Sequence, residues 1–167
     1  MSELPSVATP RQPLRWFGVA GVLLLLDQVT KLWFDSQLQY GEVREVIPHV
    51  WNWTLLYNPG AAFSFLADAG GWQRHFFTLL ALAVAAVLSW MLVKGKQSRL
   101  MDASCALILS GAISNLIDRV LYGHVIDFIQ WYWQDFYWPA FNIADSAITV
   151  GAVLMVLDGF RSGKNKE

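Results

Sequence analysis

The chain has 167 residues, of which 55% are hydrophobic and only 15% are charged, and its formal net charge is −1. Soluble domains carry about 25% charged residues, so this composition argues against a soluble globular protein and indicates a membrane protein. A nearly neutral chain offers no strongly basic surface for nucleic acid, and a single cysteine excludes an intrachain disulfide.

Four apolar segments are long enough to cross a bilayer, which takes about 20 residues in a helix. They cover residues 16–34, 76–93, 100–122 and 143–160. No small-residue cleavage site follows the first apolar core, so we interpret it as a retained span rather than a removable signal peptide. The predicted fold is therefore a single, mainly α membrane domain with four transmembrane helices.

The distribution of lysine and arginine predicts the orientation of these spans. Eight of the 12 basic residues lie at the N-terminus, between the second and third spans, or in the C-terminal tail: Arg11, Arg15, Lys94, Lys96, Arg99, Arg161, Lys164 and Lys166. By the positive-inside rule, both termini are expected in the cytoplasm. The connections 35–75 and 122–141 are then expected on the outer, periplasmic side.

Both outward connections are rich in tryptophan, which favours the membrane–water interface. In the first, REVIPHVWNWTLLYN has the β-branched and aromatic composition of strands, so a small strand-bearing platform is expected on the outer side. Asn58-Pro59-Gly60 is interpreted either as a turn that ends a hairpin or as a backbone edge for a peptide substrate. The second, GHVIDFIQWYWQDFYWPAFN, could form an interfacial helix lying on the membrane.

Polar residues inside the spans are costly in a bilayer and usually mark function or helix contacts. Asp27 and Lys31 are four residues apart in the first span, and we expect an ion pair that ties this helix to the outer platform. In the third span, Asn115 and Asp118 share one helix face, with Arg119 beside them. This face is either a helix–helix contact or part of a functional site in the bundle interior.

Two further carboxyl groups are predicted to meet near the outer membrane face. Asp127 follows the third span, and Asp145 lies near the start of the fourth, so both lie at one face of the membrane and meet if these spans pack together. Two close carboxyl groups share one proton and titrate as a pair. In aspartic proteases the ionised member takes a proton from water and the protonated member polarises the substrate carbonyl.

Three other functions remain open at this point. His124 with Asp127 and Asp145 could bind a metal ion, although His124 follows a glycine and has no second histidine nearby in sequence. The carboxylates could also serve a proton- or ion-coupled transporter, although four spans without a repeat are few for that purpose. The third alternative is a non-catalytic assembly factor that binds signal peptides.

Four motifs, in this order among the four spans, resemble the lipoprotein signal peptidase family, also called signal peptidase II. They are DQVTK, NPGAAFS, GAISNLIDRVLYGHVIDFI and FNIADSAI, which begin at residues 27, 58, 111 and 141. The resemblance covers nearly the whole chain, and no motif position departs from the family pattern.

The resemblance implies an aspartic endopeptidase of the bacterial inner membrane, with no metal or cofactor. Its substrate would be a prolipoprotein whose lipobox cysteine carries diacylglycerol, and it would cut just before that cysteine. Prolipoprotein and membrane lipid would be its partners, without nucleic acid, and a monomer is expected. Asp127 and Asp145 would be the catalytic residues. The residues that would support the pair or hold substrate are Asn58, Gly60, Asn115, Arg119 and Asn142. The remaining polar residues, with a structural role, are Asp27, Lys31 and Asp118.

Overall fold

The computed structural model describes residues 13–60 and 72–164, with side chains described as far as residue 162. Its helices are α1 (Pro13–Gln37), α2 (Trp72–Lys94), α3 (Arg99–Leu121) and α4 (Ile143–Lys164). Its strands are β1 (Val43–Ile47), β2 (Trp51–Asn58), β3 (Val125–Trp133) and β4 (Phe136–Tyr137). All four helices are long and apolar enough to cross a membrane. The predicted class, a four-helix membrane protein with a small sheet, is confirmed.

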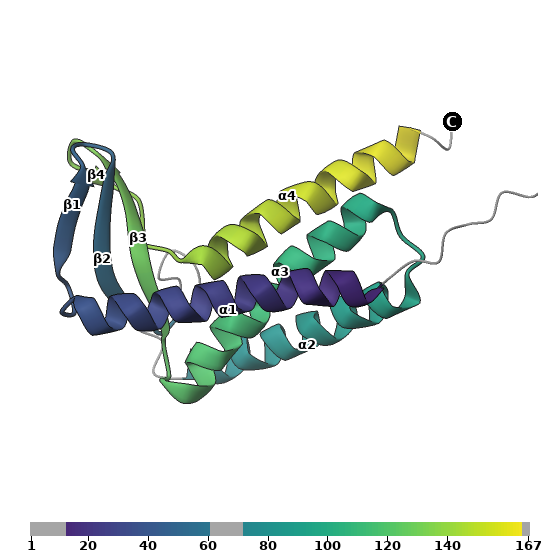
Figure 1. Cartoon of the computed structure of the whole chain (residues 1–167), viewed down its shortest axis with the longest axis horizontal. Helices are drawn as coiled ribbons and strands as arrows, with labels where there is room; N and C mark the ends of the chain where they lie inside the picture. The colour runs from purple at the N-terminus through teal and green to yellow at the C-terminus, as the bar shows by residue number, and fades with distance from the viewer. Residues whose placement is uncertain (1–12, 61–71, 165–167) are drawn as a thin grey trace, which may run out of the picture.

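The sheet stands at one end of the helix bundle (Figure 1). Helices α1 and α3 end beside it, and α4 begins there. The connection between α2 and α3, with Lys94, Lys96 and Arg99, lies at the opposite end. The sheet and the basic connection are therefore separated by the length of the bundle.

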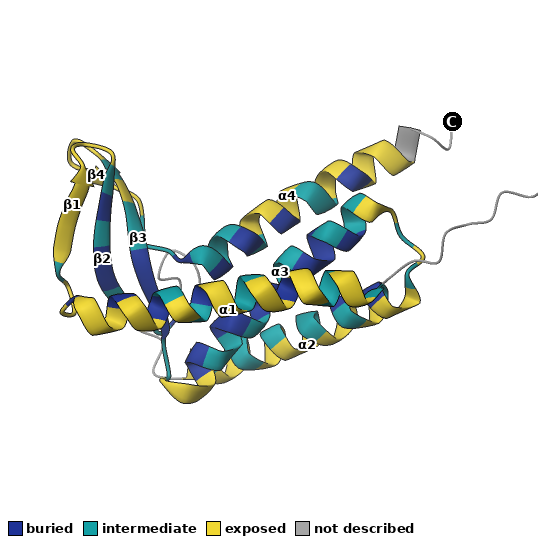
Figure 2. Ribbon diagram, viewed as in Figure 1, coloured by how far each residue is buried: buried dark blue, intermediate teal, exposed yellow. Residues whose placement is uncertain are grey.

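Helix α3 is the centre of the bundle, because it packs against α1, α2 and α4. In its most apolar stretch 56% of the residues are buried, against 11% to 22% in the other three helices. Exposed residues follow the outer faces of α1, α2 and α4 (Figure 2). These faces carry large apolar side chains such as Leu25, Leu79 and Val153, as expected of surfaces that meet lipid rather than water.

Glycines bring α3 and α4 into close contact. A Cβ atom at Gly111 would lie 2.3 Å from the carbonyl oxygen of Ala144 and 2.7 Å from a side-chain carbon of Ile148. At Gly151, a Cβ atom would lie 2.7 Å from a side-chain carbon of Ile108. Small residues permit this approach of helices in membranes, and here it determines how near the start of α4 lies to α3.

The sheet has the order β1-β2-β3-β4, with antiparallel pairing throughout. Ile126 and Phe128 of β3 belong to a buried apolar cluster with Phe34 of α1 and Leu38, the residue directly after α1. Successive residues of a strand point to opposite faces. Asp127, which lies between Ile126 and Phe128, therefore points away from this cluster.

The prediction that residues 122–141 could form an interfacial helix is wrong, because this segment contains β3 and β4. Strand β3 pairs with β2, for example with Gln130 opposite Asn52, and Phe141 pairs back onto Ile129. The stretch VIDFIQWYW is rich in β-branched and aromatic residues, which fit a pleated sheet once a partner strand is available. That partner comes from the first outward connection, far away in the sequence.

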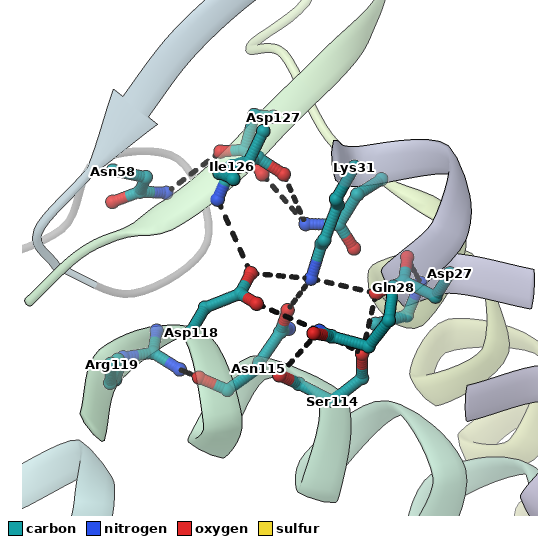
Figure 3. A network of polar contacts seen from close by, with 12 residues as sticks. Asp27, Gln28, Lys31, Asn58, Ser114, Asn115, Asp118, Arg119, Ile126 and Asp127 are labelled. Atoms are coloured by element: carbon teal, nitrogen blue, oxygen red, sulfur yellow. Dashed lines mark hydrogen bonds and ion pairs between the residues drawn. The ribbon is translucent and has the colours of Figure 1, made fainter. Parts of the chain in front are cut away.

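A buried polar junction ties α1 to α3 and α4 (Figure 3). The Lys31 ammonium lies 2.7 Å from the Asp27 carboxylate and 2.8 Å from that of Asp118, and each of these side chains is 1% exposed. Asp27 also accepts hydrogen bonds from the Ser114 hydroxyl at 2.6 Å and from the backbone N–H of Ala144 at 2.7 Å. One carboxylate of α1 thus contacts both α3 and the first turn of α4.

The expected ion pair between Asp27 and Lys31 is present, but it joins helices rather than tying α1 directly to the sheet. One link from the pair to the sheet passes through Asp118, whose carboxylate accepts the backbone N–H of Ile126 at 3.4 Å. Gln28 completes the junction by donating to Asp118 at 2.7 Å. The pair therefore holds the bundle together at the end where the sheet begins.

Replacing Gly111 by alanine should lower the thermal unfolding midpoint in detergent. The new methyl group would overlap the Ala144 carbonyl, and overpacking of this kind costs roughly 1–3 kcal/mol. Gly159→Ala is the matched control, because a Cβ atom there meets nothing within 4 Å, and it should be neutral or slightly stabilising. Equal midpoints for the two variants would contradict the close approach of α3 and α4.

Replacing Asp27 by alanine should destabilise the protein by roughly 3 kcal/mol, because buried donors on Ser114 and Ala144 lose their acceptor and Lys31 loses one of two carboxylates. The measurement is thermal or denaturant unfolding in detergent. Asp27→Asn keeps an acceptor oxygen and should lose less. An Asp27→Ala protein that melts like wild type but has lost turnover would show that the pair is not structural.

Candidate active site

Strands β2 and β3 place Asn58 beside Asp127. Leu56 lies opposite Asp127 in the antiparallel register, and Asn58 lies opposite Val125. Asn58 is therefore a diagonal neighbour of Asp127 on the same sheet face. Its side-chain amide donates to Asp127 Oδ2 at 3.2 Å. The Asp127 residue is only 3% exposed, so this bond satisfies part of a buried carboxyl group.

Asn58 also forms the turn that ends β2. Its Oδ1 accepts the backbone N–H of Gly60 at 3.0 Å, which is an Asx turn. The carbonyl of Gly60 in turn accepts a 2.7 Å hydrogen bond from the Arg119 guanidinium of α3. The turn is therefore held against α3 beside Asp127. The alternative role of this segment as an edge for peptide pairing stays a prediction, and motif residues 61–64 lie outside the described residues.

Asn142 and Asp145 form a capping box at the start of α4. Asn142 Oδ1 accepts the backbone N–H of Asp145 at 2.8 Å, and Asp145 Oδ2 accepts the backbone N–H of Asn142 at 3.4 Å. This reciprocal arrangement satisfies two N–H groups that a helix leaves unpaired at its start. Asp145 consequently lies at the positive end of the helix dipole, which favours a negative charge.

The same Asn142 side chain contacts Asp127. Its Nδ2 donates to Asp127 Oδ1 at 2.7 Å and to the carbonyl of Ile126 at 3.2 Å. Asn142 is completely buried. Its amide oxygen therefore fixes the backbone of Asp145 while its amide nitrogen fixes the side chain of Asp127, and the two predicted catalytic carboxyl groups share this neighbour.

Asn115 of α3 connects Asp145 to the polar junction. Its Nδ2 donates to Asp145 Oδ1 at 2.8 Å, and its Oδ1 accepts from the Lys31 ammonium at 2.8 Å; Figure 3 shows the contact with Lys31. Arg119, one turn later, donates to the Asn115 carbonyl at 3.2 Å. The residues predicted from the sequence as supports of the pair therefore form one connected network around it.

Electrostatics at the site favour a bound proton on Asp127. Burial, and after it the neighbouring Asp145 charge, raise the pKa of Asp127 to about 8. The hydrogen bonds from Asn58 and Asn142 and the charge of Lys31 act in the opposite direction without cancelling this rise. This rise in pKa favours the protonated form of the Asp127 carboxyl group at neutral pH.

His124 lies next to Tyr57 rather than in this network. The two rings are tilted by 32° with centroids 4.2 Å apart, and burial lowers the pKa of the His124 imidazole. Within the described ranges 13–60 and 72–164, no three His, Cys, Asp or Glu residues are grouped closely enough to hold a metal ion. The alternative metal site with His124, Asp127 and Asp145 thus finds no ligand set there.

Two features of the site were not predicted from the sequence. Ser114 joins Asp27 to Gln28 through its hydroxyl, and its only signal was its position one helical turn before Asp118 on the polar face of α3. The capping role of Asn142 had a clearer signal, since an Asn followed three residues later by an acid at the start of an apolar run is typical of a helix N-terminus.

Comparisons with known proteins agree with this arrangement. The family described as signal peptidase (SPase) II matches residues 19–161. A relative from Chromobacterium violaceum named lipoprotein signal peptidase is 55% identical over 148 residues, which cover 88% of this chain and 91% of the relative. One of the same name from Pseudomonas fluorescens is 50% identical over 166 residues and 98% of both chains.

The fold comparison extends this result to three dimensions. A solved structure described as a bacterial membrane enzyme, determined by the in meso method at 2.3 Å resolution, superposes with a TM-score of 0.82. It is 34% identical in sequence, and the alignment covers 92% of each chain. With a family match over most of its length and relatives that share half of its residues, the chain belongs to the signal peptidase II family.

Proposed function

We propose that this chain is an aspartic endopeptidase that removes the signal peptide from prolipoproteins, cutting just before a cysteine that carries diacylglycerol. The observation that carries the proposal is the single buried amide, Asn142, that binds both Asp127 and Asp145. The family and the name of its curated members, lipoprotein signal peptidase, support the substrate class.

The location of the pair suits such a substrate. Asp127 lies at the start of the sheet and Asp145 in the first turn of α4, so the pair is at the boundary between the spans and the sheet. With the basic connection between α2 and α3 in the cytoplasm, this boundary faces the periplasm across the inner membrane. A cysteine anchored there by its acyl chains would present the preceding peptide bond to the pair.

The charge balance around the pair requires a proton. Two cations, Lys31 and Arg119, serve four carboxyl groups: Asp27, Asp118, Asp127 and Asp145. An uncompensated charge in a poorly solvated interior is expensive. One proton shared by Asp127 and Asp145 reduces the excess negative charge to one.

We assign that proton to Asp127 and the negative charge to Asp145. Asp145 lies at the N-terminus of α4 and accepts a hydrogen bond from Asn115, whose amide is polarised by Lys31. Both features stabilise a carboxylate. Asp127 lies on a strand, without a helix terminus, and its nearly complete burial favours the neutral form.

These charge states define a reaction without a covalent intermediate. Asp145 would take a proton from water as the water oxygen attacks the scissile carbonyl carbon, while Asp127 would give its proton to the carbonyl oxygen. The resulting diol would return a hydroxyl proton to Asp127 as the C–N bond breaks. The proton held by Asp145 would pass to the leaving amine, which restores both groups and consumes one water molecule.

Replacing Asp127 or Asp145 by asparagine should reduce turnover by roughly a thousandfold or more, because either change removes one of the two proton-transfer groups. Turnover is measured as the mass shift of a diacylglyceryl-modified prolipoprotein, and the thermal unfolding midpoint should stay near that of wild type. Asp135→Asn, at an exposed position between β3 and β4, is the matched control and should remain fully active. Full activity in either dyad variant would rule out the proposed chemistry.

The pH dependence of kcat/KM should show an alkaline limb. Activity requires protonated Asp127, so it should fall as the pH rises through about 8, the pKa raised by burial and by Asp145. Asn58→Ala removes a hydrogen bond that favours the ionised form, and the limb should therefore move to higher pH. A limb that stays in place or moves to lower pH in Asn58→Ala would contradict the assignment of the proton.

A further inference from the structure

A cavity of about 330 Å³ lies beside α4 and reaches Asp145 of the proposed catalytic pair. Aromatic residues of the outer segment line it together with residues of α4: Trp131, Trp138, Phe141, Thr149 and Val150. Asn58 and Asp145 also belong to its walls. The cavity is therefore continuous with the proposed active site, yet most of its lining takes no part in the proton transfers.

The α4 wall of this cavity offers no unused hydroxyl donor. Ser146 donates its hydroxyl to the carbonyl of Asn142 at 3.0 Å, and Thr149 donates to the carbonyl of Asp145 at 2.8 Å. An extended peptide at membrane depth would need partners for its N–H and C=O groups, whereas a hydrocarbon chain needs none. A peptide helix is about 10–12 Å across with its side chains, too wide for much of it to fit in this volume.

The cavity extends from the pair towards the membrane interior. Thr149 and Val150 follow Asp145 by four and five residues, which places them about 6–7.5 Å further along α4. Val150 is 51% exposed, and Val153, one turn later, is 54% exposed on the outer surface of the helix. The cavity thus opens towards the apolar surface of α4, and a lipid chain could enter it sideways from the bilayer.

A second cavity, of about 360 Å³, lies on the sheet side of the pair. Its walls include Asp127 and polar side chains of the sheet and the loop before it, namely Tyr40, Tyr57, Gln130 and Tyr137. Both cavities share Asn58 and residues 138–140 as a common wall. A substrate with one apolar and one polar branch that occupied both cavities would pass the pair where they meet.

We propose that the cavity beside α4 binds an acyl chain of the diacylglyceryl cysteine and so holds the preceding peptide bond at the pair. The inference rests on the proposed function, in which the lipid is attached to the residue directly after the bond that is cut. The lipid therefore begins close to Asp145. A chain in a bilayer is already surrounded by hydrocarbon, so the cavity contributes orientation rather than additional hydrophobic burial.

The test uses two substrates with the same peptide sequence, one with palmitoyl and one with butanoyl chains on the glycerol. Val150→Trp fills the cavity at a half-exposed position that tolerates a larger side chain without repacking the core. It should lower kcat/KM for the palmitoyl substrate roughly tenfold to a hundredfold, as misplacement of a reacting bond does. The butanoyl substrate, whose chains are much shorter and would fill far less of the cavity, should lose less than about twofold.

Val156→Trp is the matched control, because Val156 is 57% exposed on the same helix and does not line the cavity. It should leave both substrates unaffected. Equal losses on the two substrates in Val150→Trp, or no loss on either, would overturn the assignment of the cavity to an acyl chain. Failure of the wild-type protein to cut the palmitoyl substrate would instead overturn the proposed function.

A second measurement does not depend on cleavage. The palmitoyl substrate, with a photoactivatable diazirine in its chain, is bound to the inactive Asp127→Asn protein and cross-linked, and the adducts are mapped by mass spectrometry. Adducts in residues 145–150 and 138–141 are expected. Adducts confined to other helices would overturn the inference. A second substrate carries the diazirine in its signal peptide instead. If only this second substrate labelled the cavity, the inference would also be overturned.

Discussion

The buried ammonium of Lys31 is the interaction on which the rest of this structure depends. A fully desolvated cation is tolerated only when carboxylates and dipoles surround it, and here Asp27, Asp118 and Asn115 lie within 2.8 Å of its nitrogen. These partners come from α1 and α3, and Asp27 also holds the first turn of α4 through the Ala144 N–H. One charge therefore fixes three helices at the end of the bundle where the sheet begins.

Lys31 also orients the site through the chemistry of amides. An ammonium only donates hydrogen bonds, so the side-chain oxygen of Asn115 must face Lys31 and its NH₂ group must face Asp145. A backbone N–H has the same effect on Asn142, whose oxygen faces the N–H of Asp145 and whose NH₂ group faces Asp127. Two amides thus present donors to the two carboxyl groups, and each is oriented by a partner that can only donate.

The sequence predicted those parts of the molecule that depend on local spacing. The length of apolar runs located the spans, and the four-residue separation of Asp27 and Lys31 predicted their ion pair. Alternation of the spans across the membrane brought Asp127 and Asp145 to one end. Family resemblance, rather than spacing, supplied the roles of Asn58 and Gly60, because the turn they form is held by Arg119 from a distant helix.

The parts that the sequence did not predict depend on contacts between distant segments. Strand β3 has strand composition, but its partner β2 is separated from it in the sequence by α2 and α3. A single aromatic-rich segment at a membrane surface is equally typical of an interfacial helix. Ser114 is one of several serines in α3, and only its proximity to Asp27 distinguishes it. The sequence showed that α3 has a polar face, but it did not show which residue of that face contacts which partner.

Asp145 combines helix capping with its proposed catalytic role, and the two are compatible because a carboxylate has spare acceptor capacity. Its Oδ1 accepts from Asn115 and its Oδ2 from the backbone N–H of Asn142. An ionised carboxylate offers about four lone-pair sites, so each oxygen can still accept a hydrogen bond from water. The donors that anchor α4 also stabilise the charge that a base needs. The start of α4 can therefore be rigid without blocking the group that is to receive a proton, which explains how the fold and the proposed chemistry use the same residue.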